Sequence, residues 1–451
     1  MNEGTGPAGP PSGILFDTVD GAVEAATRAQ AIFWDHGLGL RRSVIQALRA
    51  TSVRHAGEWA RREVAETKMG RIEDKTLKNI LCAERTPGVE DLHSRAYTGD
   101  KGLTLVEYAP FGVVAAVTPS NNPAATIISN AIAILAAGNA VVFAPHPSAA
   151  GVCRDVMEAL ASAAVSAGAP EGLMTGVSPA SREKTRALLA HPGVKLNLVT
   201  GGEAIVKVAM ATGKVCKTIA AGPGNPPVVV DETALFPKCA SDIIFGASFD
   251  NGVLCIGEKE VFVVEAARER FLAAMRADAR AFELTAAQMD ALSHLVLLGE
   301  VPERALNREY VGRDAAVIAG AVGLDVPPGV RLLWGVVPDG HPLVLTEQLL
   351  PVLPVSFTPD VDSAIEAAHR AEGDRHHTAA MHSTHVGNMT RMGRRMQCSI
   401  FVKNAPTLYG LGLGEGYASM SIGTPTGDGI TKPSHFVRPL HCCLADYFRI
   451  A

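Results

Sequence analysis

Residues 111–144 read FGVVAAVTPSNNPAATIISNAIAILAAGNAVVFA, and this stretch decides the fold. The apolar run that ends at Val117 predicts a buried strand. Pro123 and Gly138 stand where a first helical turn and a C-terminal cap favour them, so the residues between them predict a buried helix. The next apolar run, NAVVFA, predicts a second strand. Because the longest apolar run falls short of the ~20 residues that span a bilayer, the stretch is better explained as a strand–helix–strand unit.

The flanking segments repeat this alternation. A helix closed by Gly168 and a strand, KLNLVTGG, follow the unit, and two or three amphipathic helices precede it between Phe16 and Glu66. Strands that alternate with helices predict a parallel, doubly wound sheet. Ligands of such sheets bind at the carboxyl ends of the strands, where we expect TPSNNP, APHPS and TGGEA.

A second α/β unit begins near the segment VVVDETALF. It continues with a strand-like segment, DGHPLVLTEQLLPVLPVSF, a short helix, DSAIEAAHRA, and a strand, SIFVKN. The glycine-rich segment LYGLGLGEGYASMSIGTPTGDG predicts a loop. The segment HCCLADYFRI alternates enough to predict a strand, which we expect to join the sheet of another subunit.

Composition excludes several classes of protein. The chain has 451 residues, 47% of them hydrophobic, and a net charge of -5 without a basic block, which argues for two or three globular domains and against nucleic acid as a partner. Its eight cysteines lack paired spacing and indicate reduced thiols in an intracellular protein. No metal-ligand spacing occurs, so we expect no metal. His376 and His377 are adjacent, and we expect them at the surface end of a helix.

Cys255, in the segment SFDNGVLCIGEKE, is the candidate nucleophile. Free cysteine is among the most often buried residue types, so a packing role is the more common one. Here the polar turn Asp250-Asn251-Gly252 precedes the cysteine and the strand-like segment EKEVFVVE follows it, which is typical of a residue presented to a cleft. An activated thiol attacks an electrophilic carbon, and the resulting oxyanion needs fixed N–H donors.

Two other segments supply candidate partners. Asn121 and Asn122 precede the helix that begins at Pro123, so one can cap that helix while the other points its amide into the cleft. The segment Thr200-Gly201-Gly202 ends a strand and begins a helix, where backbone N–H groups can approach a pyrophosphate. A tight turn or hinge is an equal alternative for these glycines.

Several segments between about Phe16 and Ala451 match the motifs of one enzyme family in the same order. They are TPSNNP, NAVVFAPHP, LVTGGE, TIAAGPGNPPVVVD, SFDNGVLCIGEKEV, TEQLLPVLPV, LGLGEGYAS, TPTGDG and LADYFRI. Together they resemble the CoA-acylating aldehyde dehydrogenases of the aldehyde dehydrogenase superfamily. The resemblance implies an α/β fold with two doubly wound domains and a small β flap for oligomerisation. After a disordered lead, 1–13, the cofactor-binding domain would comprise 14–93 and 111–228, the flap 94–110 and 431–451, and the catalytic cysteine domain 229–430.

The resemblance also implies roles for individual residues. Cys255 would be the catalytic thiol and Asn121 the oxyanion donor, while Glu347 would hold the nicotinamide ribose; from the sequence pattern alone Glu347 would be a surface carboxylate. NAD and coenzyme A are the implied cofactors. The other residues expected to bind them are Thr118, Pro119, Ala144, His146, Thr200, Gly201, Gly202, Gly222 and Leu349.

Two departures from the superfamily's pattern place the chain in the CoA-acylating branch. Ala220 stands where hydrolytic members carry a glutamate that activates water, and Ala144 replaces a lysine that contacts the adenosine ribose. Without a general base, the attack of water loses a contribution of typically 10²–10⁴-fold. A thiol with a pKa of about 8.5 is partly ionised at neutral pH, so a CoA thiol can accept the acyl group instead. No cationic side chain in FAPHP favours the 2′-phosphate of NADP.

The sequence therefore predicts an NAD-dependent, CoA-acylating dehydrogenase of acetaldehyde or propionaldehyde, reversible and with ping-pong kinetics. Two alternatives stay open: a hydrolytic NAD(P)-dependent aldehyde dehydrogenase, and a catalytically idle scaffold with the same fold. We expect a homodimer or homotetramer without nucleic-acid or membrane partners. We expect it in the cytoplasm or in the lumen of a bacterial microcompartment, where shell proteins or co-encapsulated enzymes would be its neighbours.

Overall fold

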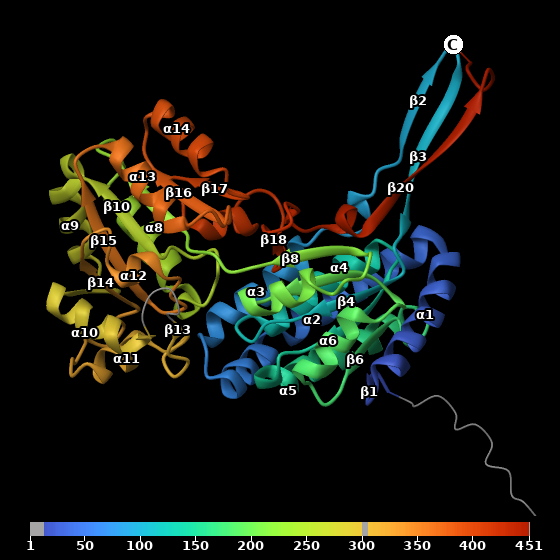
Figure 1. Cartoon of the computed structure of the whole chain (residues 1–451), viewed down its shortest axis with the longest axis horizontal. Helices are drawn as coiled ribbons and strands as arrows, with labels where there is room; N and C mark the ends of the chain where they lie inside the picture. Colours follow the sequence, from blue (N-terminus) through green and yellow to red (C-terminus); the bar gives the residue numbers. More distant parts are fainter. Residues whose placement is uncertain (1–12, 300–304, 451) are drawn as a thin grey trace, which may run out of the picture.

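The computed structural model describes residues 13–299 and 305–450. All but the last residue of the predicted disordered lead, 1–13, lies outside the described residues. Two α/β lobes lie side by side, and a narrow β flap projects away from them with the C-terminus at its tip (Figure 1). Within the described part of the chain, no helix combines the length and the apolar character that crossing a membrane requires.

The first sheet has six strands, all parallel, in the order β1-β6-β5-β4-β7-β8. Its strands are β1 (Leu15–Phe16), β4 (Val113–Val117), β5 (Ala140–Ala144), β6 (Met174–Val177), β7 (Val194–Thr200) and β8 (Lys217–Ala221). The helices of this lobe are α1 (Val19–Asp35), α2 (Gly37–Thr67), α3 (Ile72–Arg85), α4 (Pro123–Ala136), α5 (Ala150–Ser166), α6 (Arg182–Ala190) and α7 (Glu203–Met210).

The segment that decides the fold behaves as predicted. Strands β4 and β5 pair in parallel, and α4 between them is buried along its whole length. Pro123 is the first residue of α4, and Gly138 follows its end with a φ of +83°, a left-handed conformation that glycine adopts without steric cost. This unit is the centre of the first sheet, so its carboxyl edge positions the loops that follow β4 and β5.

The second sheet has seven parallel strands in the order β11-β14-β15-β10-β9-β16-β17. They are β9 (Pro227–Val230), β10 (Glu260–Val264), β11 (Ala281–Leu284), β14 (Leu332–Val336), β15 (Val352–Thr358), β16 (Thr378–His382) and β17 (Ile400–Lys403). The helices of this lobe are α8 (Lys238–Ser248), α9 (Arg268–Ala277), α10 (Ala286–Val296), α11 (Ala315–Ala321), α12 (Pro342–Leu345), α13 (Val361–Glu372) and α14 (Val386–Met396). The prediction of two doubly wound α/β units is confirmed.

The flap is an antiparallel sheet of β2 (Arg95–Gly99), β3 (Gly102–Pro110) and β20 (Val437–Ala445). The C-terminal strand was expected in the sheet of another subunit, but β20 pairs with β3 of its own chain along its whole length. The remaining short elements are β12 (Leu297–Leu298) with β13 (Ala305–Leu306), β18 (Ile422–Gly423) with β19 (Gly429–Ile430), and single turns of 3-10 helix at Val89–Asp91, Pro147–Ala149, Phe249–Gly252, Glu265–Ala267, Thr407–Leu411 and Pro433–Phe436.

Candidate active site

The candidate site lies where the carboxyl edge of the first sheet meets the amino edge of the second. The segments that follow β4, β5, β7 and β8 supply Asn121, His146, Gly202 and Gly222. The segments that precede β9, β10, β15 and β16 supply Gly224, Cys255, Glu347 and His377. The two edges touch directly, because the Asn121 side chain reaches the loop that carries Cys255.

Asn121 and Cys255 come from different sheets and are brought together. The Asn121 Nδ2 donates a hydrogen bond of 2.8 Å to the carbonyl of Val253, two residues before the cysteine. An amide N–H held beside a nucleophile is the geometry that oxyanion stabilisation requires. Their placement supports the predicted roles, which stay predictions.

The thiol of Cys255 is half-buried and neutral at rest. Burial raises its pKa to about 12, and the negative charge of Glu347 adds to this, while the positive charges of Lys259 and Lys78 act in the opposite direction. A nucleophilic cysteine needs thiolate character, so this thiol requires activation. A cation brought into the cleft would lower its pKa.

Glu347 is partly buried in this cleft. Its Oε1 accepts a hydrogen bond of 3.2 Å from the backbone N–H of Gly224, and burial raises the pKa of its carboxyl group. The carbonyl of Leu349, another predicted cofactor residue, accepts a hydrogen bond of 2.8 Å from the N–H of Gly312. Glu347 therefore joins the amino ends of β9 and β15 beside Cys255.

His377 was expected at a surface helix end, and that expectation is wrong. Its neighbour His376 is exposed, but His377 is only 1% exposed because it enters the buried strand β16. Its backbone N–H donates to Glu372 Oε1 at 2.8 Å, and its Nδ1 lies 2.9 Å from Thr378 Oγ1. Burial lowers its pKa to about 4, so the imidazole is neutral at physiological pH.

His377 lies against the backbone of the nucleophile. A methyl group on Gly224 would stand 2.6 Å from the Cys255 carbonyl oxygen and 2.9 Å from His377 Cγ, so glycine is what permits this close approach. The His377 Nε2 is buried without a hydrogen-bond partner among the described residues. A buried polar atom left unpaired costs free energy and often marks a site that a ligand completes.

The cofactor-side residues line the carboxyl edge of the first sheet. The buried Thr118 donates its N–H to the carbonyl of Ala144 at 3.2 Å, and Pro119 follows it in a partly buried position. Gly202 is the N-cap of α7, where it makes no side-chain cap and leaves open space beside its α-carbon. The first N–H groups of α7 therefore stay available to a phosphate, and phosphate binding there stays a prediction.

Thr200 and Gly222 are tied to the glycine-rich C-terminal loop. The Thr200 Oγ1 lies 2.7 Å from Ser421 Oγ. A methyl group on Gly222 would stand 3.1 Å from a carbon of the Pro425 ring, whereas one on Gly201 would meet Ile205 at 2.8 Å. These glycines let the segments after β7 and β8 pack closely on their neighbours. This packing fits a tight turn at Thr200-Gly201-Gly202 as well as it fits pyrophosphate binding there.

His146 lies in an environment that the sequence did not reveal. Its Nδ1 accepts a hydrogen bond of 3.2 Å from the N–H of Ser148. Burial lowers the pKa of His146, and the positive charges of Arg308 and Arg182 lower it further. The motif FAPHP lacks a cation, but these two arginines supply positive charge from elsewhere in the chain, so a ribose phosphate is not disfavoured here.

Position 220 offers only a methyl group, as predicted. Ala220 is fully buried in β8, and its N–H donates to Thr426 Oγ1 at 3.2 Å. Glu347 is the carboxylate whose charge most raises the pKa of Cys255, and it is held by Gly224.

No cluster of three or more metal-ligating side chains occurs in residues 13–299 and 305–450.

Sequence reasoning missed three buried lysines around the nucleophile loop. Lys259 donates to the carbonyl of Gly252 at 2.6 Å, and Lys75 donates to the carbonyl of Asn121 at 2.9 Å. Asn122 occupies the N-cap position of α4 without a side-chain cap, because its Oδ1 accepts from Lys78 instead. The available signal was the pair of lysines three residues apart in α3, which resembles a solvated helix face.

Comparisons with known proteins agree with this architecture. The model of the aldehyde dehydrogenase family matches residues 16–414. The chain is 48% identical over 441 residues to the acetylating acetaldehyde dehydrogenase of Salmonella typhimurium, covering 97% of this chain and 93% of that protein. It is 42% identical over 438 residues to the CoA-propanoylating propanal dehydrogenase of Citrobacter freundii, covering 97% and 94%.

Solved structures show the same fold. The propionaldehyde dehydrogenase of Rhodopseudomonas palustris with bound propionyl-CoA superposes with a TM-score of 0.93 at 41% identity, over 96% of this chain and 95% of that one. A propionaldehyde dehydrogenase from the fucose utilisation microcompartment of Clostridium phytofermentans gives 0.94 at 38%, over 97% and 100%. The resemblance found in the sequence is confirmed, and the chain belongs to the aldehyde dehydrogenase family.

Proposed function

We propose that this chain is a CoA-acylating aldehyde dehydrogenase that oxidises acetaldehyde or propionaldehyde with NAD⁺ and passes the acyl group to coenzyme A. The observation that carries the proposal is that Cys255 and the buried His377 both lie against Gly224, at a site whose position 220 lacks a carboxylate. The relatives named for acetylating and CoA-propanoylating activity, at 48% and 42% identity, support the same assignment.

The first half-reaction forms a thioester on Cys255. Its thiolate adds to the aldehyde carbon, and the Asn121 amide with the Cys255 N–H would hold the oxyanion that develops. When bound, NAD⁺ supplies the acceptor for the hydrogen and electron pair that leave this carbon. Burial and Glu347 raise the pKa of Cys255, and a positive nicotinamide ring beside the thiol would oppose that effect.

The second half-reaction transfers the acyl group to sulfur. In the tautomer whose Nδ1–H donates to Thr378 Oγ1, the His377 Nε2 has a free lone pair and can take the proton of the incoming CoA thiol. The CoA sulfur then attacks the thioester carbon, and the Cys255 thiolate leaves. Because one thioester replaces another, the exchange is nearly balanced and the reaction is reversible.

The cofactor-side residues would hold the dinucleotide and then coenzyme A in turn, since both contain an ADP moiety. Gly202 and the free N–H groups of α7 suit a pyrophosphate, and Glu347 suits a ribose hydroxyl. We propose NAD⁺ as the preferred acceptor. Arg182 and Arg308 make NADP⁺ the comparison to measure, because their positive charge acts on His146.

The test is an absorbance assay of NAD⁺ reduction with aldehydes of increasing chain length, with and without CoA. We expect steady turnover only with CoA, the highest kcat/KM for the two- and three-carbon aldehydes, and parallel double-reciprocal lines when NAD⁺ is varied against CoA. Fast turnover without CoA would instead identify a hydrolytic aldehyde dehydrogenase.

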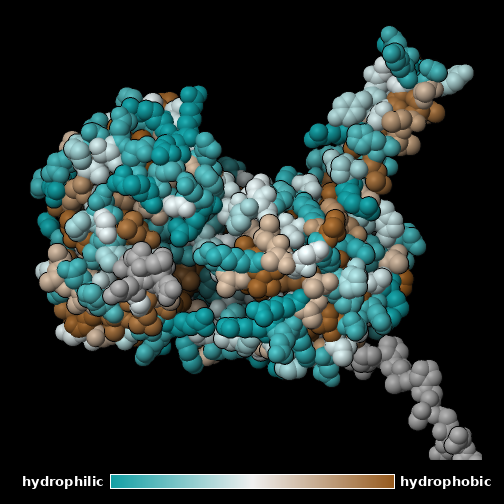
Figure 2. Space-filling model, in the orientation of Figure 1, coloured by the Kyte–Doolittle hydropathy of each residue, from teal (hydrophilic) through white to brown (hydrophobic). Residues whose placement is uncertain are grey.

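We propose that the flap mediates self-association. Hydrophobic side chains are visible on the projecting sheet (Figure 2). The exposed ones of β20 include Leu440 and Leu444 on one face, Tyr97 of β2 lies on the other face, and Tyr447 and Phe448 follow the end of β20. An edge strand with exposed apolar residues is a ready site for pairing with another chain. Light scattering of the purified chain should give a dimer or tetramer, and Leu440→Lys with Leu444→Lys should shift it toward the monomer.

The site of action in the cell follows from the relatives. One similar structure is described as coming from a bacterial microcompartment. We propose that this chain works either in the cytoplasm or in such a compartment, beside shell proteins or co-encapsulated enzymes. Fluorescent fusions with the full chain in its native host would separate punctate from diffuse localisation.

A further inference from the structure

Helix α3 buries polar side chains and exposes apolar ones, the opposite of an ordinary surface helix. Its polar side chains Asp74, Lys75, Lys78 and Asn79 are buried, whereas Ile72 and Leu77 are 38% and 39% exposed. Buried lysines are rare because desolvating an ammonium group is costly unless it is paired and hydrogen-bonded. The buried groups therefore need a specific partner, which the second lobe provides.

The partner is Asp250, in the turn that leads to Cys255. Its Oδ2 accepts from Lys75 Nζ at 3.1 Å and from Lys78 Nζ at 2.5 Å, and its Oδ1 accepts from the N–H of Arg71 at 2.7 Å. Its own N–H donates to Asp74 Oδ2 at 2.8 Å. Glu63 accepts from Lys75 at 2.8 Å and Asp74 pairs with Arg331, so three cationic groups and three carboxylates balance in the cluster.

The turn that Asp250 anchors is strained. Asp250 and Asn251 have φ values of 50° and 55°, in the left-handed region that costs roughly 1–2 kcal/mol for each residue with a side chain. Gly70 permits the approach of α3, because a methyl group there would stand 2.0 Å from Asp250 Oδ1. A strained turn of this kind persists only where its surroundings hold it in place.

The same lysines contact the loop between β4 and α4 that carries Asn121 and Asn122, here called the asparagine loop. Lys75 donates to the carbonyl of Asn121 at 2.9 Å, and Lys78 donates to Asn122 Oδ1. The Asn121 amide in turn reaches the carbonyl of Val253 at 2.8 Å. These contacts close a ring that links Asp250, Lys75, Asn121 and Val253 across the boundary between the lobes.

We propose that Lys75, Lys78 and Asp250 form a positioning clamp that sets the register between the oxyanion donor Asn121 and the nucleophile Cys255. The inference rests on the proposed function of those two residues. The three clamp residues hold these loops and do not touch the reacting atoms, and the positive charge of Lys78 also acts on the Cys255 thiol. A shift of 1 Å at a reacting centre can cost about 10²-fold in rate, which sets the scale of the expected effect.

The test removes one ion pair as a unit. In the double variant Lys78→Met with Asp250→Asn, both charges are lost and the pair of Lys75 with Glu63 remains, so neither buried charge is left alone. We expect kcat to fall by about 10²-fold, with the KM for CoA within about twofold and Tm close to that of the wild type. The matched control, Arg395→Gln with Glu366→Gln, removes an exposed pair of the same net charge and should leave kcat unchanged.

A second readout does not depend on the reaction. The rate at which iodoacetamide modifies Cys255, followed by mass spectrometry of its peptide, should change at least threefold in the clamp variant and not in the control. If the wild type lacks CoA-dependent turnover but this rate changes, the proposed function fails and the clamp stands. If kcat and the alkylation rate both stay within twofold of the wild type, the clamp is disproved.

A milder variant covers the case in which the double variant does not fold. Lys78→Gln keeps a donor for Asn122 and leaves Lys75 on Asp250, so it should fold. We expect an intermediate loss of kcat, about tenfold, and restoration of most activity by Lys78→Arg, which keeps the charge. Full activity of Lys78→Gln would overturn the proposal.

Discussion

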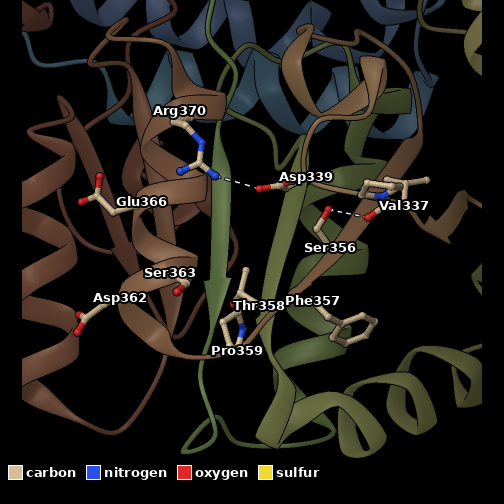
Figure 3. Close-up of a pocket in the computed structure, with 11 residues that line it drawn as sticks. Val337, Asp339, Ser356, Phe357, Thr358, Pro359, Asp362, Ser363, Glu366 and Arg370 are labelled. Carbon is tan, nitrogen blue, oxygen red and sulfur yellow. Dashed lines mark hydrogen bonds and ion pairs between the residues drawn. The ribbon is translucent and has the colours of Figure 1, made fainter.

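The two edges of the second sheet differ in kind. At the amino edge, Cys255, Glu347 and His377 converge on Gly224 and are half-buried or buried. At the carboxyl edge, a shallow groove runs over the ends of β14 and β15 beside α13, lined by Asp339, Asp362, Glu366 and Arg370 (Figure 3). The groove's charged groups are exposed. Arg370 pairs with Asp339, whereas Asp362 and Glu366 pair with two arginines of α14.

This difference qualifies a general rule. Ligands of parallel sheets bind at the carboxyl ends of the strands, and the first sheet follows that rule with the segments after β4, β5 and β7. The second sheet contributes its opposite edge, because only the amino edge contacts the asparagine loop and α3. The groove at its carboxyl edge is lined by no buried unpaired group, and the buried, unpaired Nε2 of His382 at the carboxyl end of β16 lies outside that lining.

The largest expected difference between the edges concerns the nucleophile. Cys255→Ala should lower acyl-CoA formation by about 10³-fold or more, because the thioester can no longer form. Steady-state NADH production with aldehyde and CoA measures this. The matched control is Cys398→Ala, another half-buried thiol that precedes the edge strand β17 and should retain full activity. Survival of activity in Cys255→Ala would exclude Cys255 as the nucleophile, and absence of activity in the wild type would favour the idle scaffold.

The next comparison uses the two histidines at the ends of β16. His377→Gln should slow CoA-dependent turnover by roughly 10²-fold through loss of the general base, while a single burst of NADH per site persists. His382→Gln, at the carboxyl end of the same strand, should leave both quantities unchanged. Stopped-flow absorbance separates the burst from the steady rate. A lost burst in His377→Gln would mean that the residue acts in acylation and not in acyl transfer.

How much of this site the sequence could predict follows from the range of the interactions. The pattern of buried strands, Pro123 and Gly138 predicts the first sheet, because local propensity and burial agree there. The positions of Cys255, Asn121 and Glu347 are predicted by motifs that resemble those of the aldehyde dehydrogenase family and occur in the same order. Lys78 and His377 could not be found in this way, since Lys78 is buried against Asp250 and His377 against Gly224, both far away in sequence.

The asparagine pair shows the same limit. A local rule predicts that one asparagine caps α4, but Lys78 from α3 takes the Asn122 oxygen and the cap is not made. The tertiary partner is a full charge, which makes a stronger hydrogen bond than a neutral backbone N–H. The two adjacent histidines show the limit again. His377 directly precedes a fully buried strand, and its position in the sequence does not distinguish it from its exposed neighbour His376.

His377 and His382 should each lower the free energy of unfolding in acid by the same amount. Burial lowers the pKa of both His377 and His382 from 6.5 to about 4, so the unfolded state binds more protons than the folded state between those values. Stability from each is therefore present above pH 6.5 and is lost as pH falls toward 4, by roughly 2–3 kcal/mol at pH 4.5. Urea unfolding at pH 7.5 and 4.5 should show each Gln variant losing less stability than the wild type by that amount. Equal losses in all three proteins would contradict the buried, neutral state of these rings.

The smallest effect is expected in the groove itself. Arg370 and Asp339 lie 2.9 Å apart, but their side chains are 60% and 52% exposed. Exposed pairs contribute about 0–1 kcal/mol and are screened by salt, so Arg370→Gln should change the free energy of unfolding by roughly 0.5 kcal/mol in low salt and by less in 0.5 M NaCl. Its kcat/KM should equal that of the wild type. If Arg370→Gln instead altered the KM of aldehyde, NAD⁺ or CoA severalfold, the carboxyl edge would have to be coupled to the active site through β15, whose opposite end lies next to Glu347, and the two edges would no longer be functionally separate.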